Sequence, residues 1–111
     1  MTLLELLVVT AVLGILAAIA IQEFSLFRAR AVDASMRSDL KNAAIAMENY
    51  YGEVLAYPTT EASIILYGYR KTSGVTMTIN LTSPSSYNLT AAKPSGSQAS
   101  FTFDSTTGLI N

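Results

Sequence analysis

The chain has 111 residues, a formal net charge of −1 and neither cysteine nor histidine. This length allows one small domain, or one domain together with a membrane segment. The missing residue types exclude disulfides, thiol nucleophiles, histidine general bases and the usual zinc and haem ligands. The charge balance and the scattered acidic residues argue against a nucleic-acid surface and against a paired-carboxylate active site. We therefore expect no enzyme and no cofactor.

The first segment, residues 1–22, is almost wholly apolar and reads MTLLELLVVTAVLGILAAIAIQ. A helix over residues 1–21 would be about 31 Å long, which matches the hydrocarbon thickness of a bilayer. One charge interrupts it, and an ionised carboxylate such as Glu5 costs roughly 2.5 kcal/mol or more at the bilayer centre. We expect residues 1–22 to form an apolar transmembrane or filament-core helix, and Glu5 either pairs with another copy of the chain or has a different fate.

Two alternatives concern this segment. A cleaved secretory signal would have a basic start, which the chain lacks, and the helical pattern continues past the apolar part. Glu5 could also reach the bilayer edge instead of pairing, and the residues alone leave these two fates equal. Arg28 and Arg30 follow the span, so the positive-inside rule places the rest of the chain in the cytoplasm, unless a basic leader before Met1 has been removed.

Residues 23–54 form the second predicted half of the helix. Apolar residues recur there at spacings of three and four, which predicts an amphipathic helix whose apolar stripe covers a sheet. The stripe comprises Val32, Met36, Leu40, Ala43, Met47, Tyr50 and Val54. The other face carries charged residues that either bridge neighbouring copies or face solvent: Arg30, Asp33, Arg37, Lys41 and Glu48. Asp33 and Arg37 have the spacing of a helical ion pair. Gly52 and Pro58 are expected to end the helix.

After a connector over residues 55–74, residues 75–111 alternate with period two. The predicted strands are VTMTINLTS, SYNLTAA and SFTFD, separated by turn sequences rich in Ser, Pro and Gly. The predicted fold class is α+β: a long N-terminal helix, apolar and then amphipathic, packed on an antiparallel sheet of three or four strands. Residues 23–111 would form the globular domain. Asp104 is the one acidic residue after Glu61, so we expect no metal site.

The stretch TLLELLVVTAVLGILAAIAI resembles the N-terminal signature of type IV pilins and the related pseudopilins. The resemblance covers residues 1–30 and is carried by positions that fit the family pattern: Thr2, Leu3, Glu5, Leu6, Leu7, Gly14, Ile15, Leu16, Ala17, Ala18, Ile19 and Ala20. The ending FTFDSTTGLIN also resembles the last strands of bacterial type IV pilins. Two positions depart from the pattern, because Met1 stands for the usual phenylalanine and Gln22 for the usual proline.

The resemblance implies that the chain is the mature form of a prepilin, cleaved by a membrane peptidase and N-methylated at Met1. Met1, Thr2 and Glu5 would serve subunit assembly, with the Glu5 carboxylate pairing with the Met1 amine of a neighbouring subunit. In related filaments the helix often loosens between positions 14 and 22. Gly14 and Gln22 are therefore the candidates for a melted segment, although Gln22 itself favours helix.

The resemblance further implies a structural subunit of a type IV pilus, whose partners are other copies of itself, a prepilin peptidase, an assembly ATPase with its membrane platform, and an outer-membrane secretin. The subunit would lie in the inner membrane before assembly and in an extracellular filament afterwards. Two alternatives remain: a pseudopilin of a type II secretion system, and a single-copy membrane-anchored minor pilin or adhesion module. Glu5 separates the latter from a pilin, because a lone anchor gains nothing from a carboxylate in its apolar span.

Overall fold

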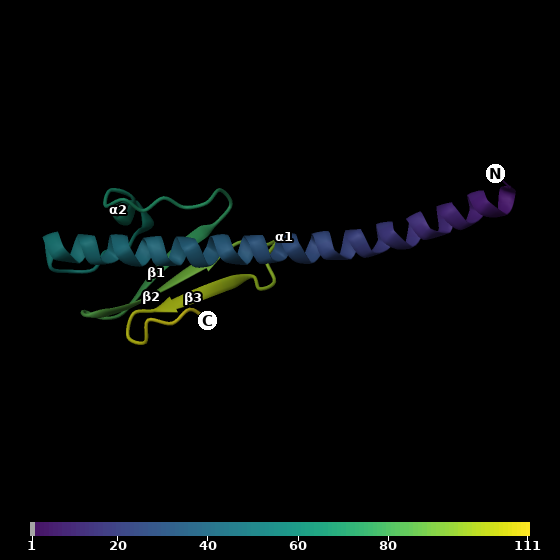
Figure 1. Cartoon of the computed structure of the whole chain (residues 1–111). Coiled ribbons are helices and arrows are strands. Elements are labelled where there is room, and N and C mark those ends of the chain that lie inside the picture. The colour runs from purple at the N-terminus through teal and green to yellow at the C-terminus, as the bar shows by residue number, and fades with distance from the viewer. Residues whose placement is uncertain (1) are drawn as a thin grey trace.

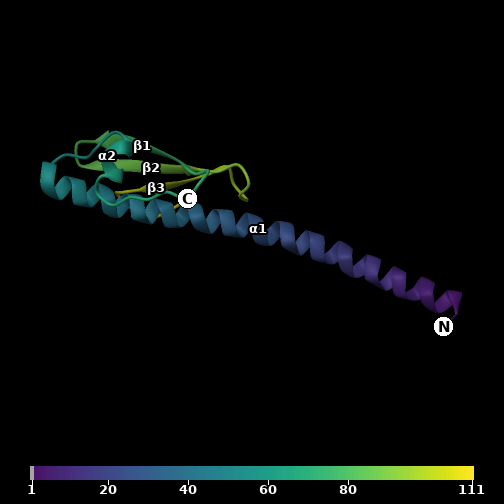
Figure 2. The same ribbon diagram turned by 90° about the horizontal axis from the view of Figure 1, so that it is seen from above.

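The computed structural model describes residues 2–111 and shows one long helix that carries a small head. Helix α1 (Leu3–Val54) runs through 52 residues without a break. Its N-terminal half extends beyond the head, and its C-terminal half packs on the sheet (Figure 1; Figure 2). The principal extents of the molecule are 78 × 24 × 16 Å. This arrangement confirms the predicted α+β fold class.

The head contains a three-stranded antiparallel sheet in the order β1 (Thr76–Ser83), β2 (Ser86–Ala92) and β3 (Ser100–Asp104). These bounds match the predicted strands within one residue. Alternating residues of the sheet point to the helix and are buried: Met77, Tyr87, Leu89, Ala91 and Phe101. The last residues return antiparallel along β3, where Thr102 and Asn111 exchange backbone hydrogen bonds of 3.0 and 2.8 Å. The C-terminal residues therefore cover the β3 edge.

The apolar stripe of α1 packs on this sheet largely as predicted. Met36, Leu40, Ala43 and Met47 are buried, and further stripe residues are partly buried. The exception is Val54, which is 48% exposed. Its prediction was wrong because the last turn of α1 projects past the sheet (Figure 1), and the chain reverses directly after it.

The connector contains a short helix that the sequence did not predict. Helix α2 (Glu61–Ile65) has five residues and places Ile64 in the core. Lys71, further along the connector, forms an ion pair with Glu61 at 3.3 Å. The connector therefore closes one end of the core.

Four carboxylates on α1 bind donors from the rest of the head, and we call them the carboxylate fasteners. Each accepts hydrogen bonds from backbone amides or hydroxyl groups, at distances of 2.9 to 3.2 Å. The contact between the Ser97 hydroxyl and Asp33 is shorter than this range. They are Asp33 with Ser97, Asp39 with Thr72, Glu48 with Tyr57 and Tyr87, and Glu53 with Tyr67. The fasteners fix the orientation of the head on the helix.

The predicted ion pair between Asp33 and Arg37 is not formed within the described residues 2–111. Asp33 accepts instead from the amide and hydroxyl of Ser97 in the β2–β3 loop. The Arg37 guanidinium lies over the ring of Phe101, 4.9 Å from its centroid. The prediction was wrong because Asp33 has its partner in the β2–β3 loop and Arg37 has its partner on β3, which a pattern of local spacing does not reveal.

The β2–β3 loop approaches α1 closely at Gly96, and replacing this glycine by alanine is expected to destabilise the head. A Cβ at this position would lie 2.6 Å from Asp33 Oδ1, 2.8 Å from Met36 Cε and 3.1 Å from the Gln98 carbonyl oxygen. Overpacking of this kind costs about 1–3 kcal/mol, measurable by thermal unfolding of the full chain in detergent.

Gly52 provides the matched control for this prediction. It lies in α1, where an added Cβ meets no atom within 4 Å. Gly52→Ala should therefore stabilise the chain by about 0.5–1 kcal/mol. Equal effects of the two substitutions would contradict the close approach at Gly96.

Buried tyrosines make the head sensitive to alkaline pH. Burial is the main cause that raises the pKa of Tyr87 and Tyr69, and the charges of Glu48 and Asp39 respectively add to it. The pKa of Tyr57 is raised by burial and by its hydrogen bond to Glu48. Above the ordinary tyrosine pKa of 10.0, the unfolded chain loses phenol protons that the folded chain keeps. The free energy of unfolding should therefore fall as the pH rises above this value.

Urea unfolding between neutral pH and about pH 11 would measure this loss. Tyr87→Phe should make the decline shallower, because one titrating phenol is removed. A decline of the same steepness in this variant would show that other groups cause it.

Candidate assembly interface

The N-terminus of α1 is closed by a reciprocal pair of hydrogen bonds between Thr2 and Glu5. The Glu5 amide donates to Thr2 Oγ1 at 3.2 Å, and the Thr2 amide donates to Glu5 Oε2 at 3.1 Å. This is a capping box, which satisfies two amides that the helix leaves without partners. The structure thus brings together two predicted assembly residues in a role that the sequence analysis missed, although the Thr-x-x-Glu spacing signals it. Met1, the third predicted residue, lies outside the described residues.

The N-terminal half of α1 exposes its apolar side chains on every side. The exposed fraction reaches 74% at Leu3 and 71% at Phe27. This part of α1 is long and apolar enough to cross a membrane, and none of its most apolar window is buried within the chain. A contiguous apolar surface of this size marks contact with lipid or another protein. We call residues 3–27, which carry this surface, the apolar shaft.

Gly14 and Gln22, the predicted melting positions, both lie within continuous α1 helix. Among residues 2–111, an added Cβ on Gly14 would meet no atom within 4 Å, so no contact there requires its small size. The predicted melting concerns subunits packed in a filament, and it stays a prediction.

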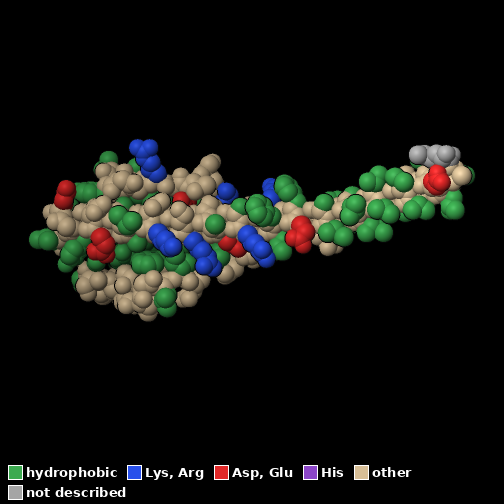
Figure 3. Space-filling view, viewed as in Figure 1, with side chains coloured by type: hydrophobic (Ala, Val, Ile, Leu, Met, Phe, Trp, Pro, Cys, Tyr) green, Lys and Arg blue, Asp and Glu red, His purple; other side chains and the backbone are tan. Residues whose placement is uncertain are grey.

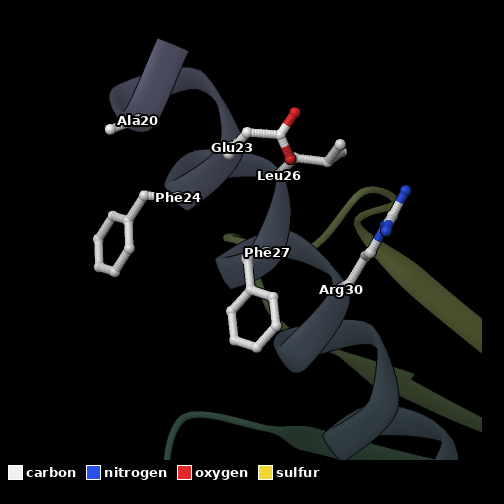
Figure 4. A pocket seen from close by; sticks show the side chains of 6 residues that line it. All are labelled: Ala20, Glu23, Phe24, Leu26, Phe27 and Arg30. Atoms are coloured by element: carbon white, nitrogen blue, oxygen red, sulfur yellow. The ribbon is translucent and has the colours of Figure 1, made fainter. Parts of the chain in front are cut away.

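Where the apolar shaft meets the head, a shallow hollow follows the helix surface. Its lining comprises Ala20, Glu23, Phe24, Leu26, Phe27 and Arg30. Figure 4 shows the rings of Phe24 and Phe27 on one side of α1, with Glu23 and Arg30 on the other. The Arg28 guanidinium lies 5.9 Å from the centroid of the Phe24 ring. The sequence analysis did not single out these two exposed phenylalanines, which extend the apolar surface to the base of the head.

In the described part of the chain, no three acidic residues gather as the ligands of a metal ion would. The features that remain are an exposed apolar helix, a capped N-terminus with a carboxylate, and a compact head. Together they define a class of protein that associates through its N-terminal helix with a membrane, with other helices, or with both.

Comparison with known proteins specifies this class. No family model matches the chain. The chain is 34% identical over 96 residues to the type IV wide pilus major component PilA4 of Thermus thermophilus, covering 86% of this chain and 73% of that protein. The chain belongs to the type IV pilin family. A structural pilin as relative points to a role without catalysis.

Proposed function

We propose that the chain polymerises into a type IV pilus through α1, with the Glu5 carboxylate pairing with the N-terminal amine of a neighbouring subunit. The observation that carries this proposal is the contrast between the two halves of α1. The C-terminal half is packed on its own sheet, whereas the apolar side chains of the shaft are exposed. Relationship to a major pilus component supports the same role.

In the filament, the apolar helices bundle at the centre and the sheets form the outer surface. Residues 1–22 act as the membrane and filament-core segment, and residues 23–111 as the globular domain. Bundling removes the apolar shaft from water, which is the main driving force of association. It also buries Glu5, so the carboxylate needs a cation.

The capping box prepares Glu5 for this contact. It holds the carboxylate at the first turn of α1, where the helix dipole favours an anion. A carboxylate accepts several hydrogen bonds, so Glu5 can accept from the Thr2 amide and also from an ammonium group of a second chain. We propose N-methylation at Met1 and loosening between Gly14 and Gln22 as further features of the assembled form.

Before assembly, we propose that the subunit spans the inner membrane once. A prepilin peptidase, an assembly ATPase with its platform and a secretin would process, polymerise and export it.

A cryo-EM reconstruction of filaments sheared from cells that express the chain would test this function. The expected result is a helical polymer of this chain with Glu5 beside a neighbour's N-terminal amine. If the chain stays in the membrane fraction and no filament contains it, a single-copy anchored module or a periplasmic pseudopilin replaces the proposal.

A further inference from the structure

The end of the head that lies away from the apolar shaft exposes several apolar side chains. Leu55, at the end of α1, is 76% exposed, and Leu66, at the end of α2, is 84% exposed. Tyr67, which follows Leu66, donates its hydroxyl to Glu53 at 2.9 Å, so the ends of α1 and α2 lie at the same end of the head. Figure 3 shows hydrophobic side chains at this end. We define the tip patch as four exposed residues: Val54, Leu55, Ile65 and Leu66.

Leu55 has a backbone conformation that favours glycine. It caps α1 with φ 60° and ψ 28°, and among residues 2–111 it is the one residue other than glycine with a positive φ. Helices usually place glycine in this left-handed conformation, because a Cβ there approaches the following carbonyl oxygen. Gly52 precedes Leu55 by three residues, yet α1 continues through it and ends at the leucine. A residue that is both strained and exposed indicates a contact with another molecule.

The last turn of α1 gives the tip patch a negative charge. Within the described helix, this turn contains Glu53 and no basic residue. The carbonyl groups that end a helix carry a partial negative charge, so a carboxylate there is unfavourable and a cation is favoured. The Tyr67 hydroxyl bound to Glu53 supplies no positive charge, and Lys71 of the connector pairs with Glu61. A partner for this end of the head should therefore offer both apolar side chains and positive charge.

The shallow hollow at the base of the head, which we call the base hollow, has both properties. Its lining includes the exposed rings of Phe24 and Phe27 (Figure 4). Arg30 also lines it, and the Arg28 guanidinium lies beside the Phe24 ring. Because these two arginines exceed the single glutamate of the lining, Glu23, the hollow carries an excess of positive charge. The tip patch and the base hollow are therefore complementary in both polarity and charge.

We propose that the tip patch of one copy docks at the base hollow of a second copy, with Leu55 against the phenylalanine rings and Glu53 near the arginines. This inference rests on the proposed function. Contact between two tip patches would bring Glu53 carboxylates together, and contact between two base hollows would bring arginines together. Contact between the unlike surfaces avoids both. It also leaves each chain of copies with one free hollow and one free tip, so the contact extends an open filament instead of closing a dimer.

Leu55→Gly should have opposite effects on the single chain and on the filament. Glycine relaxes the left-handed backbone, so the Tm of the full chain in detergent should rise. The yield of sheared filaments should fall by about tenfold, as expected for the loss of one buried leucine side chain. Leu109→Gly truncates an exposed leucine outside the tip patch and is the matched control. A yield equal to that of this control would overturn the docking, and so would a fall in both Tm and yield, which would place the role of Leu55 inside its own head.

Cysteine cross-linking detects the contact directly, because the chain contains no other cysteine. Ser25 lies beside Phe24, and Ala56 follows Leu55; both are exposed. In one chain the two positions are about 46 Å apart along α1, so a short bis-maleimide can join them only between copies. Filaments of Ser25→Cys/Ala56→Cys should therefore yield a ladder of covalent oligomers, whereas the control Ser25→Cys/Ser38→Cys should not. Filaments that form without the ladder would overturn the docking. Absence of the unmodified chain from every filament would instead overturn the proposed function.

Discussion

Replacing Glu5 by alanine is expected to abolish filament assembly or reduce it sharply, while the chain still inserts in the membrane. The neighbour's amine would lose its counter-charge in the apolar core, and loss of one member of a buried ion pair costs about 3–5 kcal/mol. Removal of a charge from the apolar shaft should, if anything, favour insertion. Filament yield after shearing and subunit content of the membrane fraction measure the two effects separately.

The capping box provides the control for this prediction, because Glu5 also closes the helix. Thr2→Ala removes the hydroxyl that accepts from the Glu5 amide but leaves the carboxylate in place. The loss of a cap costs about 1 kcal/mol, so assembly should weaken only modestly. Glu5→Gln keeps the side-chain oxygen but not the charge, and should resemble Glu5→Ala. Normal filament yield from Glu5→Ala would refute the pairing.

Replacing Asp39 by alanine is expected to destabilise the head more than any other fastener substitution. Asp39 is 3% exposed, and its carboxylate accepts from the Thr72 amide at 2.9 Å and the Thr72 hydroxyl at 3.1 Å. Alanine would leave these donors without their acceptor, and each unsatisfied buried group costs about 1–3 kcal/mol. Thermal unfolding of the full chain in detergent should show a fall in Tm of about 10 °C or more.

Ser38→Ala is the matched control for Asp39→Ala. Ser38 is the preceding residue on α1 and is exposed, so its substitution should change the free energy of unfolding by no more than about 0.5 kcal/mol. If Asp39→Ala unfolds at the same temperature as this control, water replaces the lost acceptor and the fastener has no net effect on stability.

The sequence predicted the long elements because their periodicity is strong. The stripe from Met36 to Met47 and the alternation around Met77 and Leu89 each have a clear period, and both were found. Helix α2 was missed because five residues are too few to establish a period. Asp39 was not singled out, because its partner Thr72 lies 33 residues further on and no local pattern connects them.

At the assembly interface, the sequence identified the residues but not their contacts within the chain. Glu5 was singled out as the charge within an apolar segment and Thr2 through the family resemblance, whereas the structure shows that they also cap α1. The residue pattern did not decide whether the charged face of α1 is solvated or contacts neighbouring copies of the chain. The position of the sheet decides which side of α1 each charge occupies, and this depends on the packing of the whole head.

The carboxylate fasteners have a consequence for where the head can fold. They join α1 to the rest of the head through acid groups that accept from amides and hydroxyls, and the chain contains no thiol. Formation of the head therefore needs neither an oxidising compartment nor an enzyme that transfers disulfides. Reducing agents should leave its stability unchanged, and a pool of subunits waiting in the membrane would be independent of the cell's redox balance.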